Sequence, residues 1–259
     1  MIMNRDTVDL LRVEVYPDRE TMGLHAARRA SRIIRETAQR KGTVNVMFAA
    51  APSQLDLFAA LLADERVPWE SINTFHMDEY LGLPADAPQG FGNFLKRELF
   101  DQKPFASVHL MPFSAENPEE ACRAYAAVLQ AYPLDLVCMG IGENGHIAFN
   151  DPPDARFDEP ETVKVVELEH QCRQQQVNDG CFSSLDEVPT HALTVTIPAL
   201  MSASSIVCVV PGPTKSAAVV HMLSNSVTTD CPASILRTHR DAVLYLDKLS
   251  AAAYANSEN

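Results

Sequence analysis

Residues 134–146 read LDLVCMGIGENGH. The first six form a nearly uninterrupted apolar run, which is typical of a strand that is buried on both faces of a parallel sheet. Three glycines at 140–145 then allow a sharp loop and a close approach of backbone N–H groups to a ligand. Ligands of open parallel sheets lie beyond the carboxyl ends of the strands. The stretch therefore predicts an α/β fold with a site at the loop.

The same alternation of a short apolar run and a longer helical segment recurs along the chain. Four further buried strands are predicted at Val44–Ala49, Asn73–Met77, Ile206–Val210 and Ala242–Leu246, besides Leu134–Met139. The helices predicted best are Arg19–Lys41, Leu55–Ala63, Pro118–Ala131 after the N-cap Asn117, and Ser216–Leu223. Neither a linker nor a repeat appears. We expect one α/β domain over residues 1–259, with a mostly parallel sheet, helices on both faces and a short polar tail at 250–259.

Composition limits the partners and the compartment. The net charge of −13 disfavours binding to nucleic acid or to an anionic membrane, because both attract basic surfaces. No apolar run is long enough for a transmembrane helix, and the N-terminus lacks the apolar region of a signal peptide. We expect a cytoplasmic protein whose six scattered cysteines are reduced.

Two acids and an aromatic, Asp78-Glu79-Tyr80, follow the strand predicted at Asn73–Met77. A carboxylate at this end of the sheet can abstract a proton from carbon if partial burial raises its pKa. The structural alternative is a turn that exposes both acids to water. His76 points to the other side of an alternating strand, so we expect it to pack in the core.

The glycine loop delivers one imidazole, that of His146, and does not fit the G-x-G-x-x-G dinucleotide pattern. Histidine transfers protons near neutral pH, and Asp151 could orient its ring. The structural alternative is a tight turn around a satisfied histidine.

A phosphate site is indicated where the residues Gly212-Pro213-Thr214-Lys215 open a helix, because a helix N-terminus with a lysine attracts anions. Ser53 could add a hydroxyl to the same anion. In each case the alternative is an ordinary helix start. The eight histidines show no metal-binding spacing, and we expect no catalytic metal.

Taken together, three segments resemble the glucosamine-6-phosphate deaminase/isomerase family, which is related to the 6-phosphogluconolactonases. They are Phe75-His76-Met77-Asp78-Glu79-Tyr80-Leu81-Gly82-Leu83-Pro84, Gly142-Glu143-Asn144-Gly145-His146-Ile147-Ala148-Phe149-Asn150-Asp151-Pro152 and Val188-Pro189-Thr190-His191-Ala192-Leu193-Thr194. The lactonases typically carry D-E-R and G-H-T-A-S instead of M-D-E-Y and G-H-I-A-F-N. The resemblance implies the deaminase branch and its Rossmann-like sheet.

The resemblance also implies roles for individual residues. Asp78 would be the base that moves a proton between C2 and C1 of the open-chain amino sugar. His146 would open the pyranose ring, assisted by Asn144 and Asp151. Lys215 would hold the phosphate with the loop around Ser53, and we expect Glu79 and Gly145 to contact the substrate. No metal or organic cofactor is needed.

Several positions depart from the family pattern. Ala51 and Pro52 occupy the usual glycines of the phosphate loop, and proline has no N–H to donate. Asp151 stands where glutamate is common, and its shorter side chain leaves open whether it reaches His146 directly or through water. Asn144 replaces a frequent aspartate. The usual phosphate arginine is missing from segment 174–182; Arg173 or Arg237 could substitute, although neither is in register.

The leading expectation is an aldose–ketose isomerase that deaminates glucosamine 6-phosphate to fructose 6-phosphate. A galactosamine-6-phosphate isomerase, a phosphosugar lactonase and a non-catalytic sugar-phosphate sensor are the alternatives. The expected partner is a small sugar phosphate, and a homo-oligomer is left open.

Overall fold

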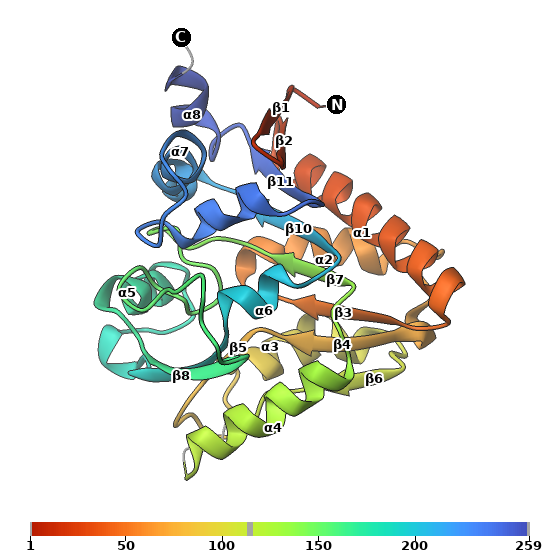
Figure 1. The fold of residues 1–259 in the computed structure, drawn as a ribbon, viewed down its shortest axis with the longest axis vertical. Helices are drawn as coiled ribbons and strands as arrows, with labels where there is room; N and C mark the ends of the chain where they lie inside the picture. Colours follow the sequence, from red (N-terminus) through yellow and green to blue (C-terminus); the bar gives the residue numbers. More distant parts are fainter. Residues whose placement is uncertain (1, 113–115, 258–259) are drawn as a thin grey trace.

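An eight-stranded sheet runs through the computed structural model, which describes residues 2–112 and 116–257 (Figure 1). The strand order is β1-β2-β11-β10-β7-β3-β4-β6. The strands are β1 (Asn4–Val8), β2 (Leu11–Tyr16), β3 (Val44–Phe48), β4 (Ile72–His76), β6 (Ser107–His109), β7 (Leu136–Met139), β10 (Ser205–Val210) and β11 (Ala242–Asp247). All neighbours pair in parallel except the β1–β2 hairpin at one edge.

The central strands are apolar because both of their faces are covered. Along β10, Ile206, Cys208 and Val210 enter one hydrophobic core, whereas Val207 and Val209 enter the other. This period of two is the alternation of side chains across a pleated strand. Two separate apolar layers therefore hold the sheet between them.

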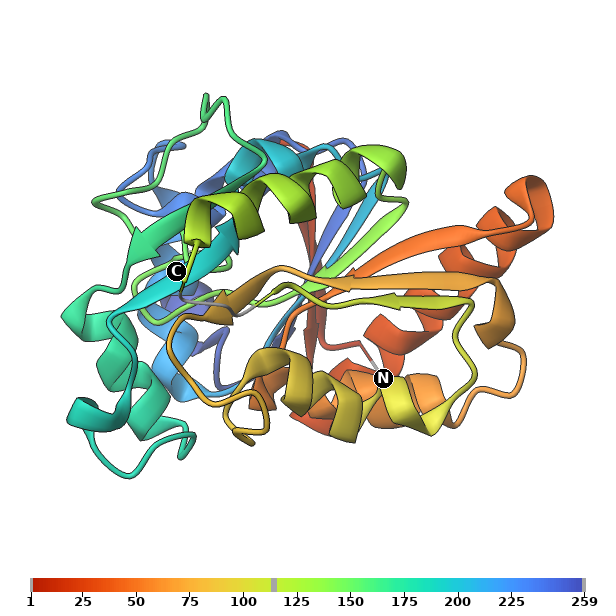
Figure 2. The same cartoon turned by 90° about the horizontal axis from the view of Figure 1, so that it is seen from below.

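Helices cover the two faces, as Figure 2 shows from below. The longest is α1 (Arg19–Lys41), which packs against α2 (Leu55–Leu62), and α3 (Phe91–Glu98) joins the same core on this face. The opposite face carries α4 (Pro118–Ala131), α6 (Ile197–Met201), α7 (Ser216–Ser224) and α8 (Ala252–Ser257). Short 3-10 turns lie at Pro52–Gln54, Trp69–Ser71, Phe100–Gln102, Leu185–Glu187, Pro213–Lys215 and Pro232–Thr238.

A second, three-stranded sheet lies beyond the carboxyl end of β4 (Figure 1). Its order is β5-β9-β8, formed by β5 (Asp78–Tyr80), β9 (His191–Val195) and β8 (Val163–Glu167), with antiparallel pairing throughout. Helix α5 (His170–Asn178) follows β8. This sheet fixes the backbone of Asp78, which pairs with Thr194 of β9.

The five strands and four helices expected from the sequence are all present within about two residues of their expected bounds. Asn117 caps α4, since its side chain accepts a hydrogen bond from the N–H of Glu120. The expected polar tail differs: part of it forms α8, because the Tyr254 side chain is buried in the core beside α7. Within the described ranges, every helix is too short or too polar to cross a membrane.

Candidate active site

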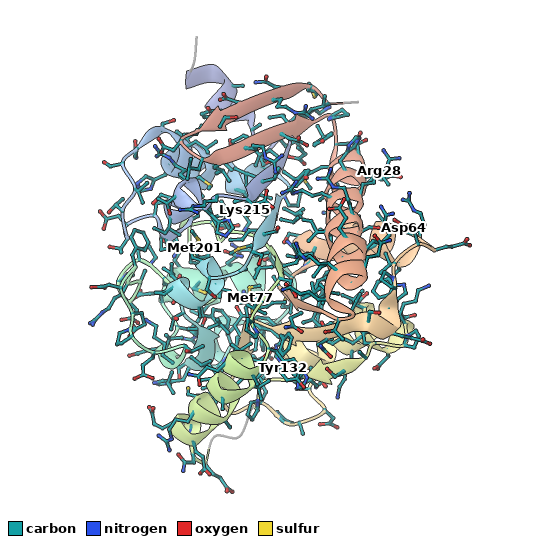
Figure 3. All side chains as sticks on the ribbon, turned by 45° about the vertical axis from the view of Figure 1, so that its right-hand side comes forward. Arg28, Asp64, Met77, Tyr132, Met201 and Lys215 are labelled. Carbon is teal, nitrogen blue, oxygen red and sulfur yellow. The ribbon has the colours of Figure 1, made fainter. Side chains whose placement is uncertain are left out.

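A cavity of about 270 Å³ opens at the carboxyl ends of the strands, between the loops that follow β3, β4, β7 and β10. Its size is close to the lower end of the range for small-molecule sites, roughly 300–1,000 Å³. Polar or charged side chains in its wall belong to Arg19, Ser53, Asp78, His146, Gln175, Gln176, Asp179, Thr214 and Lys215. Lys215 and Met77, which are labelled in Figure 3, both line this cavity.

Asp78 lies in the cavity wall with its side chain buried. Burial raises the pKa of its carboxyl well above the usual range, and the neighbouring Glu79 carboxylate raises it further. A buried carboxylate that ionises only at higher pH is a stronger proton acceptor once it is ionised. The group can therefore act as a general base.

His76 holds the backbone of Asp78 and does not reach the cavity. Its Nε2 accepts a hydrogen bond from the Met111 N–H at 2.7 Å, so Nδ1 carries the proton and donates to the Asp78 carbonyl at 2.9 Å. Burial lowers the pKa of His76 to about 4, which keeps the ring neutral. The expectation that His76 packs in the core is confirmed.

Glycines shape the loop after β7 around the imidazole of His146. A Cβ at Gly142 would lie 2.3 Å from the ring, so only glycine leaves room for it. Gly145 has φ +82°, and a Cβ there would also meet Cys231 Sγ at 2.6 Å. The Gly142 N–H donates to the His146 carbonyl at 2.9 Å, which closes the loop. The loop is therefore built to place the His146 ring in the cavity wall.

Asp151 lies directly against the His146 ring. Its Oδ1 lies 3.0 Å from His146 Nδ1, although the ring N–H is not well aligned with this oxygen. The same Oδ1 accepts a hydrogen bond of 2.8 Å from Asn144, whose Oδ1 in turn accepts from the His146 N–H at 3.1 Å. The shorter aspartate reaches the ring without a bridging water, because the turn at 147–150 brings residue 151 against it.

Partners outweigh burial at Asp151. Burial alone raises the pKa of this carboxyl, but the contacts with His146, Asn144 and Cys172 together hold it below its ordinary value.

One group of potential metal ligands is found among residues 2–112 and 116–257. It consists of His146, Asp151 and Cys172, whose ligand atoms lie within 4.8 Å of one another. Burial raises the pKa of the Cys172 thiol, which disfavours the thiolate that a metal would bind.

Lys215, Thr214 and Ser53 line the same cavity, the first two beside the start of α7. The Lys215 side chain is buried; desolvation lowers its pKa, while the carboxylates of Asp179 and Glu143 act in the other direction. The N–H of Gly212 is already engaged by the Asp247 carboxylate at 3.2 Å. The helix start thus offers mainly the ammonium of Lys215 to an anion.

The arginine in this wall is Arg19, which the sequence had not indicated. Its guanidinium donates to the Pro52 carbonyl at 3.1 Å and to Asp56 at 2.6 Å, which places it against the loop that carries Ser53. Neither expected substitute reaches the cavity: Arg173 donates to the carbonyls of Leu185 and Val188. Arg237 pairs with Asp9.

The remaining predicted site residues lie behind the cavity wall. Both oxygens of Glu79 accept backbone N–H groups, from Phe91 at 2.9 Å and from Gly92 at 2.8 Å, at the start of α3. Glu79 borders a different hollow. Gly145 acts through its loop conformation, and its carbonyl accepts from Ala233 at 2.8 Å. Asn144 and Asp151 support His146 from behind. Gln175, Gln176 and Asp179, from α5 and its end, line the cavity and were not predicted.

Comparisons with known proteins agree with this geometry. The family model "Glucosamine-6-phosphate isomerases/6-phosphogluconolactonase" matches residues 17–245. Glucosamine-6-phosphate deaminases of Bacillus cytotoxicus and of an Exiguobacterium strain are each 33% identical to this chain; the first match covers 84% of this chain and 80% of the relative, and the second 90% and 89%.

Solved structures share the fold. A monomeric glucosamine-6-phosphate deaminase superposes with a TM-score of 0.85 at 28% identity, covering 93% of this chain and 99% of the other. A 6-phosphogluconolactonase from Trypanosoma brucei superposes with a TM-score of 0.77 at 16% identity, covering 96% and 99%.

Proposed function

Because this chain belongs to the family of glucosamine-6-phosphate isomerases and 6-phosphogluconolactonases, we propose that it converts glucosamine 6-phosphate and water to fructose 6-phosphate and ammonium. The observation that carries the proposal is the buried Asp78, whose carboxyl has a raised pKa and shares one small cavity with His146 and Lys215. A carboxylate of raised pKa is a stronger base than a solvated one, which favours proton abstraction from carbon.

The proposed reaction uses His146 first. The imidazole moves a proton between the ring oxygen and the anomeric hydroxyl, which opens the pyranose to the aldehyde. Asp151 and Asn144 hold the ring in place for this step. Their role is positioning, because both lie behind the imidazole and not in the cavity wall.

Asp78 then carries out the isomerisation. Its carboxylate takes the proton from C2 of the open-chain amino sugar, and the resulting carboxylic acid returns that proton to C1. A proton from the amino group passes to the aldehyde oxygen, which becomes the C1 hydroxyl. The product is an imine at C2, to which water adds. The C–N bond then breaks, the C2 carbonyl of fructose 6-phosphate forms, and the nitrogen leaves as ammonium.

Local cations bind the phosphate in this proposal. The net charge of −13 repels a dianion at long range, so short-range contacts must supply the attraction. Lys215 provides a buried ammonium, Arg19 a guanidinium at the rim, and Thr214 and Ser53 provide hydroxyls. A phosphosugar rather than a dinucleotide fits both this single cluster and the cavity volume.

An ammonium assay over glucosamine, galactosamine and mannosamine 6-phosphates tests the reaction, with 6-phosphogluconolactone hydrolysis followed in parallel. We expect ammonium and a ketose phosphate from glucosamine 6-phosphate. Asp78→Asn should lower kcat by on the order of 10²-fold or more while binding persists. The matched control is Asp86→Asn at an exposed loop position, which should retain full activity.

Three outcomes would contradict the proposal. Lactone hydrolysis without ammonium release would assign the lactonase reaction. Preference for galactosamine 6-phosphate would assign the other epimer. Sugar-phosphate binding without turnover, in wild type as in Asp78→Asn, would indicate a sensor.

A further inference from the structure

A second concave site lies between α1 and the β1–β2 hairpin, and its wall is dominated by arginines. We call this site the arginine groove; it is lined by Arg5, Arg12, Arg28, Arg29, Arg32, Arg35 and Arg66, with Glu14, Val243 and Tyr245. Its volume is about 700 Å³. Figure 3 shows Arg28 on the outer side of α1, next to the hairpin. No residue lines both this groove and the active-site cavity.

The charge of the groove opposes that of the molecule. The chain carries 21 lysines and arginines against 34 acids, yet seven arginines line the groove with a single glutamate. Lysine is absent from this wall. A guanidinium presents a rigid fork of donors that matches phosphate oxygens two at a time, whereas lysine acts as a point charge.

Only part of this positive charge is neutralised by the protein. Arg5 pairs with Glu14, Arg12 and Arg29 share Asp241, and Arg66 pairs with Asp64. The other three have no carboxylate within ion-pair distance in the described part of the chain: Arg28, Arg32 and Arg35.

Those three arginines occupy one face of α1. Their spacing of four and then three residues places like charges side by side on the helix, which disfavours the helix. An anion in the groove would turn the repulsion into attraction.

Buried donors in the groove also lack acceptors. The Arg29 side chain is only 8% exposed; its Nη2 donates to Asp241 at 2.6 Å, but its Nε has no hydrogen-bond partner in the described structure. The Nε of Arg35 is likewise buried and unpaired. Buried donors are nearly always satisfied by protein, water or ligand. These N–H groups therefore favour a bound acceptor.

We propose that the arginine groove binds a small ligand with a chain of two or more phosphates, such as a nucleoside triphosphate or a condensed inorganic phosphate. The volume lies within the small-molecule range of roughly 300–1,000 Å³. Several separated guanidiniums suit several phosphates better than one. A longer polyanion such as RNA would extend onto the acidic remainder of the surface, which repels it.

The test is calorimetric titration of the whole protein with sodium triphosphate at about 0.15 M salt, where the screening length is roughly 8 Å. We expect saturable binding that is tighter than that of orthophosphate. Arg32→Gln should weaken it roughly tenfold or more, as loss of a charge-assisted contact does. The matched control is Arg40→Gln, which removes one exposed charge from the same helix outside the groove. Lys215→Ala reports any contribution from the active-site cavity.

Further arms separate the sources and the rivals. ATP binding more tightly than triphosphate would identify a nucleotide, and equal affinities would identify the phosphate chain alone. Equal losses in Arg32→Gln and Arg40→Gln would overturn the proposal in favour of nonspecific attraction. So would loss of binding in Lys215→Ala only, or binding of a single-stranded RNA but not of triphosphate. A melting curve of Arg32→Gln confirms folding, and the result does not depend on the proposed deaminase activity.

Discussion

Two buried aspartates of the candidate site respond differently to the same burial. At Asp78 burial raises the pKa, and the Glu79 carboxylate raises it further. Asp151 is equally enclosed, but His146 and Asn144 contact its Oδ1 and the net pKa is lowered. One carboxyl is therefore suited to accept a proton from substrate, and the other to remain ionised behind an imidazole.

His146 should matter for the cyclic sugar more than for an open-chain substrate. His146→Gln removes the group that opens the ring but leaves Asp78 in place, so turnover of glucosamine 6-phosphate should fall by about 10²-fold or more. An open-chain analogue should lose roughly tenfold or less. Steady-state kinetics on both substrates check this, and equal losses on both would contradict the division of labour.

Lys215 should dominate phosphate binding. Loss of its buried charge should weaken substrate binding by about 1.5–3 kcal/mol, or roughly 10- to 150-fold, whereas Ser53→Ala removes a neutral contact of about 0.5–1.5 kcal/mol. Arg19 is half-exposed and paired with Asp56, so Arg19→Ala should have a smaller effect that decreases further as salt rises.

Calorimetry with substrate and with inorganic phosphate measures these losses. Arg97→Ala is the control, because Arg97 is a similarly exposed arginine with a neighbouring acid, Glu98. Wild-type affinity in Lys215→Ala would place the phosphate elsewhere, with Arg19 as the next candidate.

Site residues were predictable from the sequence where a strand was predictable. Asp78, His146 and Lys215 each follow a strong apolar run, and the structure brings all three to one cavity. Arg19 was missed because β2, which precedes it by a short turn, was not predicted. The alternating Leu11-Arg12-Val13-Glu14-Val15-Tyr16 was the available signal.

At the scale of elements, Glu79 connects β5 to the start of α3. Its carboxylate accepts hydrogen bonds from the N–H groups of Tyr80, Phe91 and Gly92. Glu79 therefore caps the N-terminus of α3, although it lies about a dozen residues before that helix in the sequence. Glu79→Gln should lower the free energy of unfolding by about 1–3 kcal/mol, since the amide N–H₂ would face backbone donors.

Thermal melting checks this, with the exposed Glu70→Gln as the control, which should stay within about 0.5 kcal/mol. If Glu79→Gln instead kept full stability and lost turnover, the sequence-based expectation of a substrate contact would stand.

Local patterns could not reveal the small sheet. Strand β5 has three residues and pairs with β9 more than a hundred positions later, so its pairing partner cannot be predicted from its own sequence. The long buried strands and α1 were predictable because their periodicity is intrinsic to their sequence. The contact between Asp151 and His146 was predicted, but its directness was not, because that depends on a tight turn and not on side-chain length.

At the scale of the whole molecule, α1 connects the two proposed anion-binding regions. Its first residue, Arg19, borders the active-site cavity, and Arg28 to Arg35 border the arginine groove. The acidic remainder of the surface disfavours nonspecific anions, so the two local concentrations of positive charge carry the selectivity for anions.

Stability and activity should both depend on pH through Asp78. Its folded-state pKa is raised above the unfolded value near 3.8, so the native protein binds more protons between these two values, and the free energy of unfolding falls as pH rises through that window. Asp78→Asn has no such group. Its melting temperature should match that of wild type below about pH 4 and exceed it increasingly at higher pH. The underlying difference in the free energy of unfolding is about 1.4 kcal/mol for each unit by which the pKa of Asp78 is raised. This corresponds to roughly 2–4 °C per kcal/mol for a chain of this size.

Asp151→Asn should show the opposite sign, because the lowered pKa of Asp151 stabilises the native state above its unfolded pKa and loses this effect as pH falls. Since the ionised Asp78 is the proposed base, kcat/KM should rise with pH over the same window in which the two melting curves of wild type and Asp78→Asn diverge. Melting temperatures and kcat/KM measured across pH 3–8 therefore follow the titration of Asp78 in two independent ways. If the melting temperatures of wild type and Asp78→Asn diverged at one pH and kcat/KM rose at a different pH, Asp78 would not be the catalytic base.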